Sequence, residues 1–266
     1  MAKTYLLMTQ SKKGKNRVSF AEDRKETISK GGGFHPEILN AFKTPNSFYV
    51  VKQPIFNFEG PLKKVGYEFL SRFNEPFFQM PEDFFRVSTE QNILTLVDHF
   101  CLKNCIEVSK PFGSGISLHI NLYPSTLLEI PLECILEELS AGGKNKNYCI
   151  ELGESIIFGD TTNLVKPIEA LRKAGIKIAL DNVGFGRTRL ESLLALEPDV
   201  IKVDKKLVIG ISDSKEQLVS LKRLLKVAAS LEAEVIAEGI ETEKDLNVLK
   251  DLGVKYGQGF LWGKPA

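Results

Sequence analysis

From Phe48 to the end of the 266-residue chain, short apolar runs that favour strands alternate with longer segments that favour helices. Repeated strand–helix units build a mostly parallel sheet covered by helices, and about eight of them are typical of a closed, TIM-like (β/α)8 barrel. We predict strands at 49–58, 65–73, 115–121, 147–152, 176–181, 199–204, 233–238 and 255–260. We predict helices at 81–107, 163–174, 188–196, 214–231 and 242–252.

The first two predicted strands, 49–58 and 65–73, differ from the others because only six residues join them. Parallel strands need a crossover of about a dozen residues, so this pair must be a hairpin. The α/β barrel therefore contains one antiparallel strand at its start. Upstream, three consecutive glycines within a polar stretch predict a linker over 21–47, which leaves 48–266 as the barrel domain.

Composition excludes several classes of protein. The chain is 43% hydrophobic and 26% charged, which is ordinary for a globular protein with a large core. No apolar run approaches the 18 or so residues of a membrane segment, and the N-terminal apolar stretch is too short for a secretory signal, so we expect a cytoplasmic protein.

The net charge is +1. Residues 1–30 hold eight Lys or Arg against three Asp or Glu, which either attracts nucleic acid or forms a solvated tail. The remainder is not basic, which argues against binding to a nucleic acid polymer.

The four cysteines show no metal-binding pattern. Cys101 and Cys105 are four residues apart in a helical pattern and could hold a metal ion, but nothing supplies the other half of such a site. We therefore interpret the cysteines as buried thiols.

Polar residues close six of the predicted strands. Side chains alternate across a strand, so the apolar parity packs under helices and the polar parity faces the barrel axis near the C-terminal rim, where barrel enzymes place their chemistry. Buried carboxylates are costly when unpaired, but several of them with an Asn carbonyl are the hard oxygen ligands that Mg²⁺ or Mn²⁺ prefers. Ion pairs at the rim are the alternative. The six residues are Glu68, Asn121, Glu151, Asp181, Lys202 and Glu238.

The motifs around these residues resemble the EAL family of cyclic-di-GMP phosphodiesterases over about 49–266. GYEFLSR resembles the family's naming motif, with Phe69, which we expect to be a packing change, in place of the middle Ala. QPIF, HINLYP, IELGES (Gly153 replacing Thr), ALDNVGFG, IKVD, AEGIE and QGF resemble the family's other motifs in the same order. The resemblance implies hydrolysis of one phosphodiester of cyclic-di-GMP to give linear pGpG, with one or two Mg²⁺ or Mn²⁺ ions that clamp the phosphate and activate water.

The resemblance also implies roles for individual residues. Asp181 would bridge to a second ion, which Asn182 and Glu238 would also contact. Lys202 would position water or stabilise charge in the transition state, and Glu238 could instead act as a general base. The ligands of the first ion would be Glu68, Asn121, Glu151 and Asp181. The remaining residues that the resemblance implies are Glu154, which would steady the loop after Asp181, and the dinucleotide contacts Gln53, Leu70, Arg72 and Gln258.

One departure from the family bears on activity. Asn182 stands where the family motif has a second Asp, so the second ion should bind more weakly and the nucleophilic water should be less acidic. Arg187 and Arg189 in the next loop could grip phosphate, partly replace a cation, or face solvent. Two functions follow: a slow metal-dependent phosphodiesterase, or a silent receptor that binds cyclic-di-GMP and signals through a partner. Loss of the ligand altogether would leave a protein–protein module, against which Arg72 and Gln258 argue.

The N-terminal tail carries a second resemblance. MTQSKKGKNRVSF, with a predicted helix at 4–12 and strand at 16–20, resembles the last helix and strand of a GGDEF diguanylate cyclase domain. This implies that residues 1–20 are a remnant of such a domain in a longer protein, too short to synthesise cyclic-di-GMP. The sequence leaves open whether the protein forms a homodimer.

Overall fold

The computed structural model describes residues 47–74, 81–143, 145–153, 161–184 and 190–266. The predicted helix at 4–12, the strand at 16–20, the 1–20 remnant, nearly all of the 21–47 linker, and the residues Glu154, Arg187 and Arg189 lie outside these ranges. The chain divides into two compact units, Met1–Val50 with Ser71–Cys101 and Val51–Leu70 with Leu102–Ala266. No helix in the described ranges is long and apolar enough to cross a bilayer.

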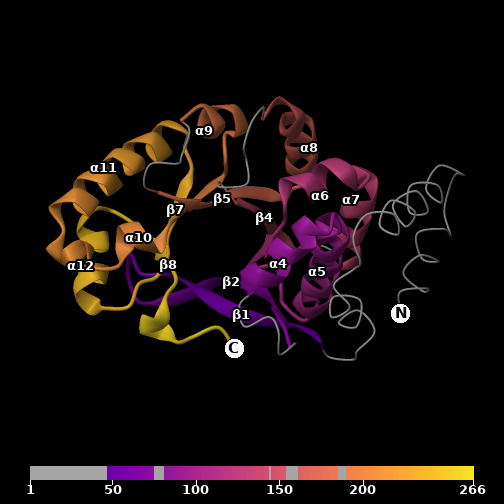
Figure 1. Ribbon diagram of the computed structural model, residues 1–266. Helices are drawn as coiled ribbons and strands as arrows, with labels where there is room; N and C mark the ends of the chain where they lie inside the picture. The colour runs from indigo at the N-terminus through magenta and orange to yellow at the C-terminus, as the bar shows by residue number, and fades with distance from the viewer. Residues whose placement is uncertain (1–46, 75–80, 144, 154–160, 185–189) are drawn as a thin grey trace, which may run out of the picture. The chain divides into compact units, whose positions relative to one another are not determined.

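Eight strands close into a barrel in the order β1 to β8, which confirms the predicted fold class (Figure 1). β1 pairs antiparallel with β8, with Phe56 opposite Gly257, and the pairs from β2–β3 through β7–β8 are parallel. The one antiparallel strand at the start is therefore also confirmed. The strands are β1 (Phe48–Asn57), β2 (Lys63–Phe73), β3 (Ser117–Asn121), β4 (Asn147–Gly153), β5 (Lys177–Val183), β6 (Val200–Val203), β7 (Glu234–Ala237) and β8 (Tyr256–Gly257).

The predicted last strand, 255–260, is wrong in length because β8 has only two residues. After β8 the backbone turns onto the segment at Ile240, whose N–H donates to the carbonyl of Gln258 at 3.1 Å. A Cβ at Gly259 would lie 2.1 Å from the Ile240 carbonyl oxygen, so only glycine allows this approach. The chain leaves the sheet at this point.

The helices differ from the prediction in three places, one of which is α10 (Lys205–Val208), a short helix that was not predicted. The predicted helix at 81–107 is two helices, separated near Asn92, whose φ of 55° is left-handed. Two helices between β3 and β4 were not predicted, and Pro124 and Pro131 lie at their starts, where proline is tolerated. The helices are α4 (Pro81–Glu90), α5 (Leu94–Ser109), α6 (Pro124–Glu129), α7 (Leu132–Ala141), α8 (Thr162–Lys173), α9 (Leu190–Leu196), α10 (Lys205–Val208), α11 (Lys215–Ser230) and α12 (Glu243–Asp251), with short 3₁₀ turns η2 (Ile211–Asp213) and η3 (Phe260–Trp262).

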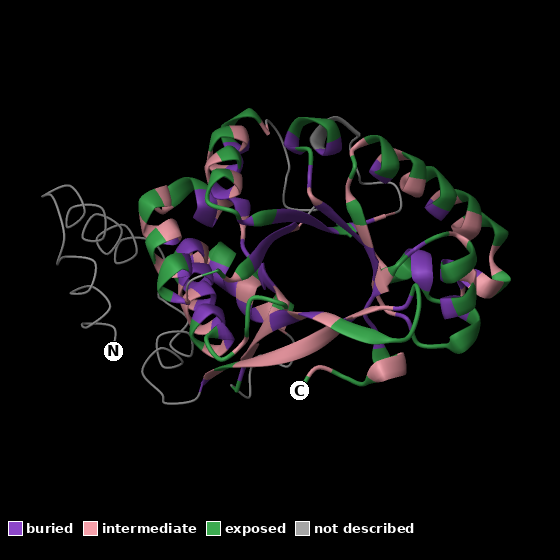
Figure 2. Ribbon diagram, turned by 180° about the vertical axis from the view of Figure 1, so that it is seen from behind, coloured by how far each residue is buried: buried purple, intermediate pink, exposed green. Residues whose placement is uncertain are grey.

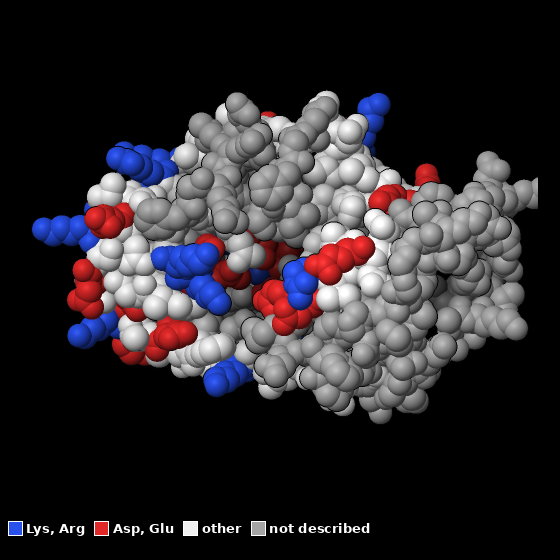
Figure 3. All heavy atoms as spheres, viewed as in Figure 1, with Lys and Arg blue, Asp and Glu red and all other residues white. Residues whose placement is uncertain are grey.

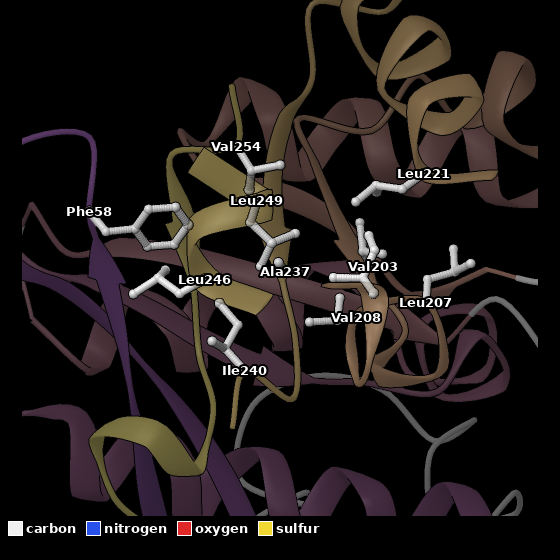
Figure 4. Packing of buried hydrophobic residues seen from close by; sticks show 11 residues of the cluster. Phe58, Val203, Leu207, Val208, Leu221, Ala237, Ile240, Leu246, Leu249 and Val254 are labelled. Atoms are coloured by element: carbon white, nitrogen blue, oxygen red, sulfur yellow. The ribbon is translucent and has the colours of Figure 1, made fainter. Parts of the chain in front are cut away.

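The larger unit has two apolar layers, one on each side of the sheet. In Figure 2 the strands from β3 to β6 are mostly buried, β1 is mostly intermediate, and green, exposed residues lie on the outer sides of the helices. Small and branched side chains from five strands fill the inside of the barrel: Ile55, Cys149, Ala179, Val200 and Ile236. Between the sheet and helices α10, α11 and α12 lies a second cluster, shown in Figure 4, of Phe58, Val203, Leu207, Val208, Ile211, Leu221, Ala237, Ile240, Leu246, Leu249 and Val254.

The smaller unit is held by aromatic packing. Phe73 stacks on Phe84 with ring centroids 3.9 Å apart, and Phe48 meets their edges at 5.1 and 5.5 Å. The N–H of Asn74 donates to the carbonyl of Ser47 at 2.8 Å, which joins the two strand segments of this unit. Aromatic pairs of this kind contribute about 0.5–1.5 kcal/mol each beyond the area they bury.

Asp245, buried in α12, fastens the turn that follows α10. Its carboxylate accepts the N–H of Ser212 at 3.0 Å, the N–H of Gly210 at 3.3 Å and the hydroxyl of Thr242 at 2.8 Å. Thr242 in return caps the helix by accepting the N–H of Asp245 at 3.1 Å. Although burial opposes it, these hydrogen bonds lower the pKa of Asp245 below its ordinary value.

Replacing Asp245 with alanine should lower the free energy of unfolding by about 1–3 kcal/mol, because buried N–H groups lose their acceptor. The lowered pKa means that this stabilisation is present above the unfolded pKa, about 4, and is lost as the pH falls through the folded value. The difference in the free energy of unfolding between wild type and variant, measured by urea denaturation, should therefore become smaller at acid pH. Asp251→Ala, at the exposed end of α12, is the matched control and should change stability by less than about 0.5 kcal/mol. An equal effect of both variants would contradict this assignment.

Candidate metal centre

Strand alternation carries the polar side chains into the barrel above the apolar filling. Cys149, Ala179, Val200 and Ile236 face inward, so the residues two positions later on their strands face inward as well, one step nearer the C-terminal rim. Those residues are Glu151, Asp181, Lys202 and Glu238. The register sets Asn121 beside Glu151 and Glu68 beside His119.

Lys202 is the centre of this group. Its side chain is fully buried, and its ammonium nitrogen contacts four carboxylates, of which Glu68 lies in the middle of β2 and Glu238 directly follows β7. The distances from Nζ are 2.8 Å to Glu151, 3.0 Å to Glu68, 3.0 Å to Glu238 and 3.4 Å to Asp181. The structure therefore brings these five predicted residues together, and it does so through ion pairs, the alternative to a metal site. Acidic atoms gather at the middle of the face in Figure 3.

Amide side chains hold two of the carboxylates. The nitrogen of Asn121 donates to Glu68 Oε1 at 3.0 Å. The nitrogen of Gln258, which is buried, donates to Glu68 Oε2 at 2.6 Å and to Glu238 Oε1 at 2.9 Å. Gln258 was predicted as a dinucleotide contact, but here its nitrogen is used inside the site.

The charges in this group do not balance, since four carboxylates surround one ammonium. Burial raises the pKa of Glu238 to about 8 against the opposing charge of Lys202, and raises the pKa values of Asp181 and Glu151 in the same way. Glu68 is the exception, because Lys202 and the amide hydrogen bonds outweigh its burial and lower its pKa to about 2. Despite burial, the four carboxylates together raise the pKa of Lys202 well above its ordinary value. The excess negative charge favours another cation.

β5 contains a bulge at the point where the family motif changes. Leu180 pairs with Ile201 and Val183 pairs with Val203, so Asp181 and Asn182 together oppose the single residue Lys202. Asn182 has a left-handed φ of 60°, which asparagine and aspartate tolerate better than most residues. Its amide nitrogen donates to Asp181 Oδ2 at 2.5 Å. Its carbonyl oxygen is therefore the atom left to ligate an ion.

The donor atoms suit a hard divalent cation, but their spacing is set for an ammonium. Nitrogen–oxygen distances of 2.8–3.4 Å exceed the roughly 2.0–2.1 Å that Mg²⁺ requires. In keeping with this, the described residues hold no group of three His, Cys, Asp or Glu already arranged to enclose an ion. Asp181 Oδ1 is buried and accepts no hydrogen bond from the described part of the chain, and the charged group that it pairs with there is Lys202 Nζ, at 3.4 Å. The donor atoms of these residues therefore fit such an ion in kind, while the carboxylates are spaced around the Lys202 ammonium.

The three other residues predicted to contact the dinucleotide lie on β1 and β2. Gln53 is half-buried on β1, two residues before the inward-facing Ile55, and Leu70 is half-buried on β2, two residues after Glu68. Arg72 belongs to the smaller unit, where its guanidinium donates to the carbonyl of Ser71 at 3.0 Å.

The structure also shows the positions of Phe69 and His119, two side chains near the predicted metal ligands. Phe69 is buried with its ring 5.6 Å from that of Phe112, as expected of a packing change. His119 was not predicted as a site residue, yet its Nδ1 lies 2.8 Å from Glu151 Oε1. Burial and the charge of Lys202 lower the pKa of His119 to about 3, so the ring is neutral. The signal that could have found it is its parity, since it shares a strand face with Asn121.

A sequence profile described as "EAL domain" matches residues 37–265. The chain belongs to the EAL domain family. Among relatives of this EAL chain, the cyclic di-GMP phosphodiesterase PdeA of Borreliella burgdorferi is 31% identical over 86% of the chain. The chain spans only 35% of that relative's length.

Solved structures of the EAL family share the fold. BlrP1 of Klebsiella pneumoniae, in a complex with calcium and cyclic-di-GMP, superposes with a TM-score of 0.73 at 27% identity and covers 83% of this chain and 56% of its own. The same protein with manganese and cyclic-di-GMP has a TM-score of 0.73 at 26% identity, over 84% of this chain and 57% of its own. Both complexes pair cyclic-di-GMP with a divalent ion.

Replacing Lys202 with methionine should lower the stability of the metal-free protein by about 3–5 kcal/mol, because four buried carboxylates lose their counter-charge. Adding Mn²⁺ should restore part of the loss, since the ion replaces the missing positive charge. Thermal denaturation with and without Mn²⁺ measures both effects. Lys222→Met, on the exposed surface of α11, is the control and should change neither. A Lys202→Met protein as stable as wild type without metal would contradict the central role of this ammonium.

Proposed function

We propose that this EAL domain is a metal-dependent phosphodiesterase that hydrolyses cyclic-di-GMP to pGpG. The observation that carries the proposal is the convergence of four carboxylates, Asn121 and Lys202 at the rim of a barrel of this family. The Borreliella relative named as a phosphodiesterase and the calcium and manganese complexes of BlrP1 support it. The metal is Mg²⁺ or Mn²⁺, as one or two ions.

Glu68, Asn121, Glu151 and Asp181 would hold the first ion, and Asp181, Asn182 and Glu238 the second. When bound, the ions would polarise the phosphate and lower the pKa of the attacking water. The Lys202 ammonium, released from the carboxylates that the ions take over, would stabilise the charge that develops on the phosphate. The alternative role for Glu238 is that of general base, in place of ligating the second ion.

The remaining residues would position the dinucleotide. We assign Gln53, Leu70 and Arg72 to contacts with it, and Glu154 to steadying the loop after Asp181. Gln258 would orient Glu68 and Glu238, to which it already donates, so its contact with the ligand would use the opposite side of its amide. Its Oε1 is buried and has no hydrogen-bond partner among the described residues, which makes that atom available.

The second candidate function is a receptor that binds cyclic-di-GMP without cutting it. Asn182 favours it, because this ligand brings no charge to the second ion. The spacing of the carboxylates around Lys202 favours it as well, since the ammonium competes with metal for the same oxygens.

The two functions separate in one pair of measurements. Incubation with cyclic-di-GMP and Mn²⁺ followed by chromatography should show pGpG, and a Glu68→Gln protein should lose at least about 100-fold in rate, because an ion loses a charged ligand. No product above that variant would sink the phosphodiesterase. Calorimetric binding of cyclic-di-GMP without turnover would then establish the receptor, and no binding with or without Mn²⁺ would exclude both.

Restoring the family residue should increase activity. Asn182→Asp adds a charged ligand in a backbone conformation that aspartate tolerates, and we expect a gain of about tenfold in turnover at limiting Mn²⁺, corresponding to about 1.4 kcal/mol. Asn182→Gly keeps the left-handed backbone without a ligand and should lower turnover. Steady-state rates across a Mn²⁺ titration measure both. Equal rates for all three proteins would show that position 182 does not ligate an ion.

The setting of this domain is also a proposal. We place it in the cytoplasm as part of a longer signalling protein, since the chain spans about a third of its Borreliella relative. The tail over 1–20 would be the end of a preceding GGDEF domain, with 21–47 as the linker. Cyclic-di-GMP is the proposed partner, and a homodimer is compatible with it.

A further inference from the structure

His119 lies beneath the ligand set rather than in it. It occupies the middle of β3, opposite Glu68 on β2 and Cys149 on β4. Its side chain is 3% exposed, and it faces the barrel axis one step below Asn121. No role in the proposed hydrolysis has been given to it so far.

The two oxygens of Glu151 are held by different partners. Nδ1 of His119 lies 2.8 Å from Oε1, and Nζ of Lys202 lies 2.8 Å from Oε2. Glu151 is completely buried, so water cannot replace either partner. In the described part of the chain, His119 is the one residue that hydrogen-bonds Oε1.

The contacts of Lys202 and His119 with Glu151 would respond differently to a bound metal ion. The Lys202 contact competes with the ion for the carboxylate, whereas the His119 contact comes from below and approaches a different oxygen. Our inference takes Nδ1 as the protonated ring nitrogen, so that it donates to Oε1 and fixes the rotation of the carboxylate. Hydrogen-bond partners that orient a metal-ligating carboxylate typically contribute 10- to 100-fold to metal affinity.

We propose that His119 is a positioning residue that holds Glu151 in the orientation required to ligate the divalent ion. The inference rests on the metal-binding part of the proposed function. It predicts that removing the Nδ1–H donor weakens Mn²⁺ binding, and that restoring a donor at the same position recovers it, independently of any catalytic assay.

The test compares two variants of equal size. Leucine and asparagine have nearly the same shape, and the asparagine amide nitrogen is as many bonds from Cα as Nδ1 of histidine is. Both variants lose the imidazole ring, so the difference between them isolates the hydrogen bond. Ile236→Val, which removes one methylene from the apolar filling of the same barrel, controls for general loosening.

Calorimetric titration of the metal-free proteins with MnCl₂ gives the result. We expect His119→Leu to bind Mn²⁺ about 10- to 100-fold more weakly than wild type, and His119→Asn to recover most of that loss. Ile236→Val should bind as wild type does. If His119→Leu fails to fold, His119→Met against His119→Gln repeats the matched comparison.

Equal Mn²⁺ affinities for the leucine and asparagine variants would overturn the role of His119 and leave the proposed phosphodiesterase intact. A wild-type protein that binds no Mn²⁺ would overturn the metal centre, and the inference with it. The two failures are therefore distinguishable.

Discussion

One ammonium among four carboxylates determines what the inside of this barrel can contain. Bringing Glu68, Glu151, Asp181 and Glu238 together out of water would be prohibitive without a counter-charge, and Lys202 supplies it from the one strand whose end is basic. The cost is tolerated because five of the strands contribute small or branched side chains below this level, which lets the charged layer lie on a filled apolar one.

The same arrangement supplies the oxygen atoms that a divalent metal ion prefers, but at the distances that suit an ammonium. Burial raises the pKa values of Glu151, Asp181 and Glu238, and the single positive charge of Lys202 does not offset it. An ion of higher charge would relieve this, but it demands shorter distances than an ammonium does. Under the proposed function, metal binding would be an exchange of cations, and affinity would depend on how easily the Lys202 side chain gives up its contacts. This is a physical reason for activity to vary among domains that share the same ligands.

Strand parity was enough to predict most of this from the sequence. Six strand-end residues were assigned to one rim because alternation and the barrel fold leave them no other place. His119 was missed because a histidine below the rim has no apolar neighbour on its own face to mark it as unusual, and only the register with β4 brings it to Glu151. The short β8 could not be predicted, because it depends on a backbone approach between Gly259 and Ile240 that are far apart in sequence. The break at Asn92 depends on a single left-handed residue inside a pattern that is otherwise helical.

The bulge in β5 makes Asn182 an extra residue that the pairing of the strand does not require. Val183 pairs with Val203 on the side of the sheet that faces the helices. With regular alternation, Asp181 faces inward and residue 182, not 183, would face the helices. Asn182 is thus an inserted residue: the chain could lose it and still present Asp181 to the interior and Val183 to the helix layer. Under the proposed function, gain or loss of this one residue would add or remove a metal ligand at the rim while the strands on either side keep their pairing.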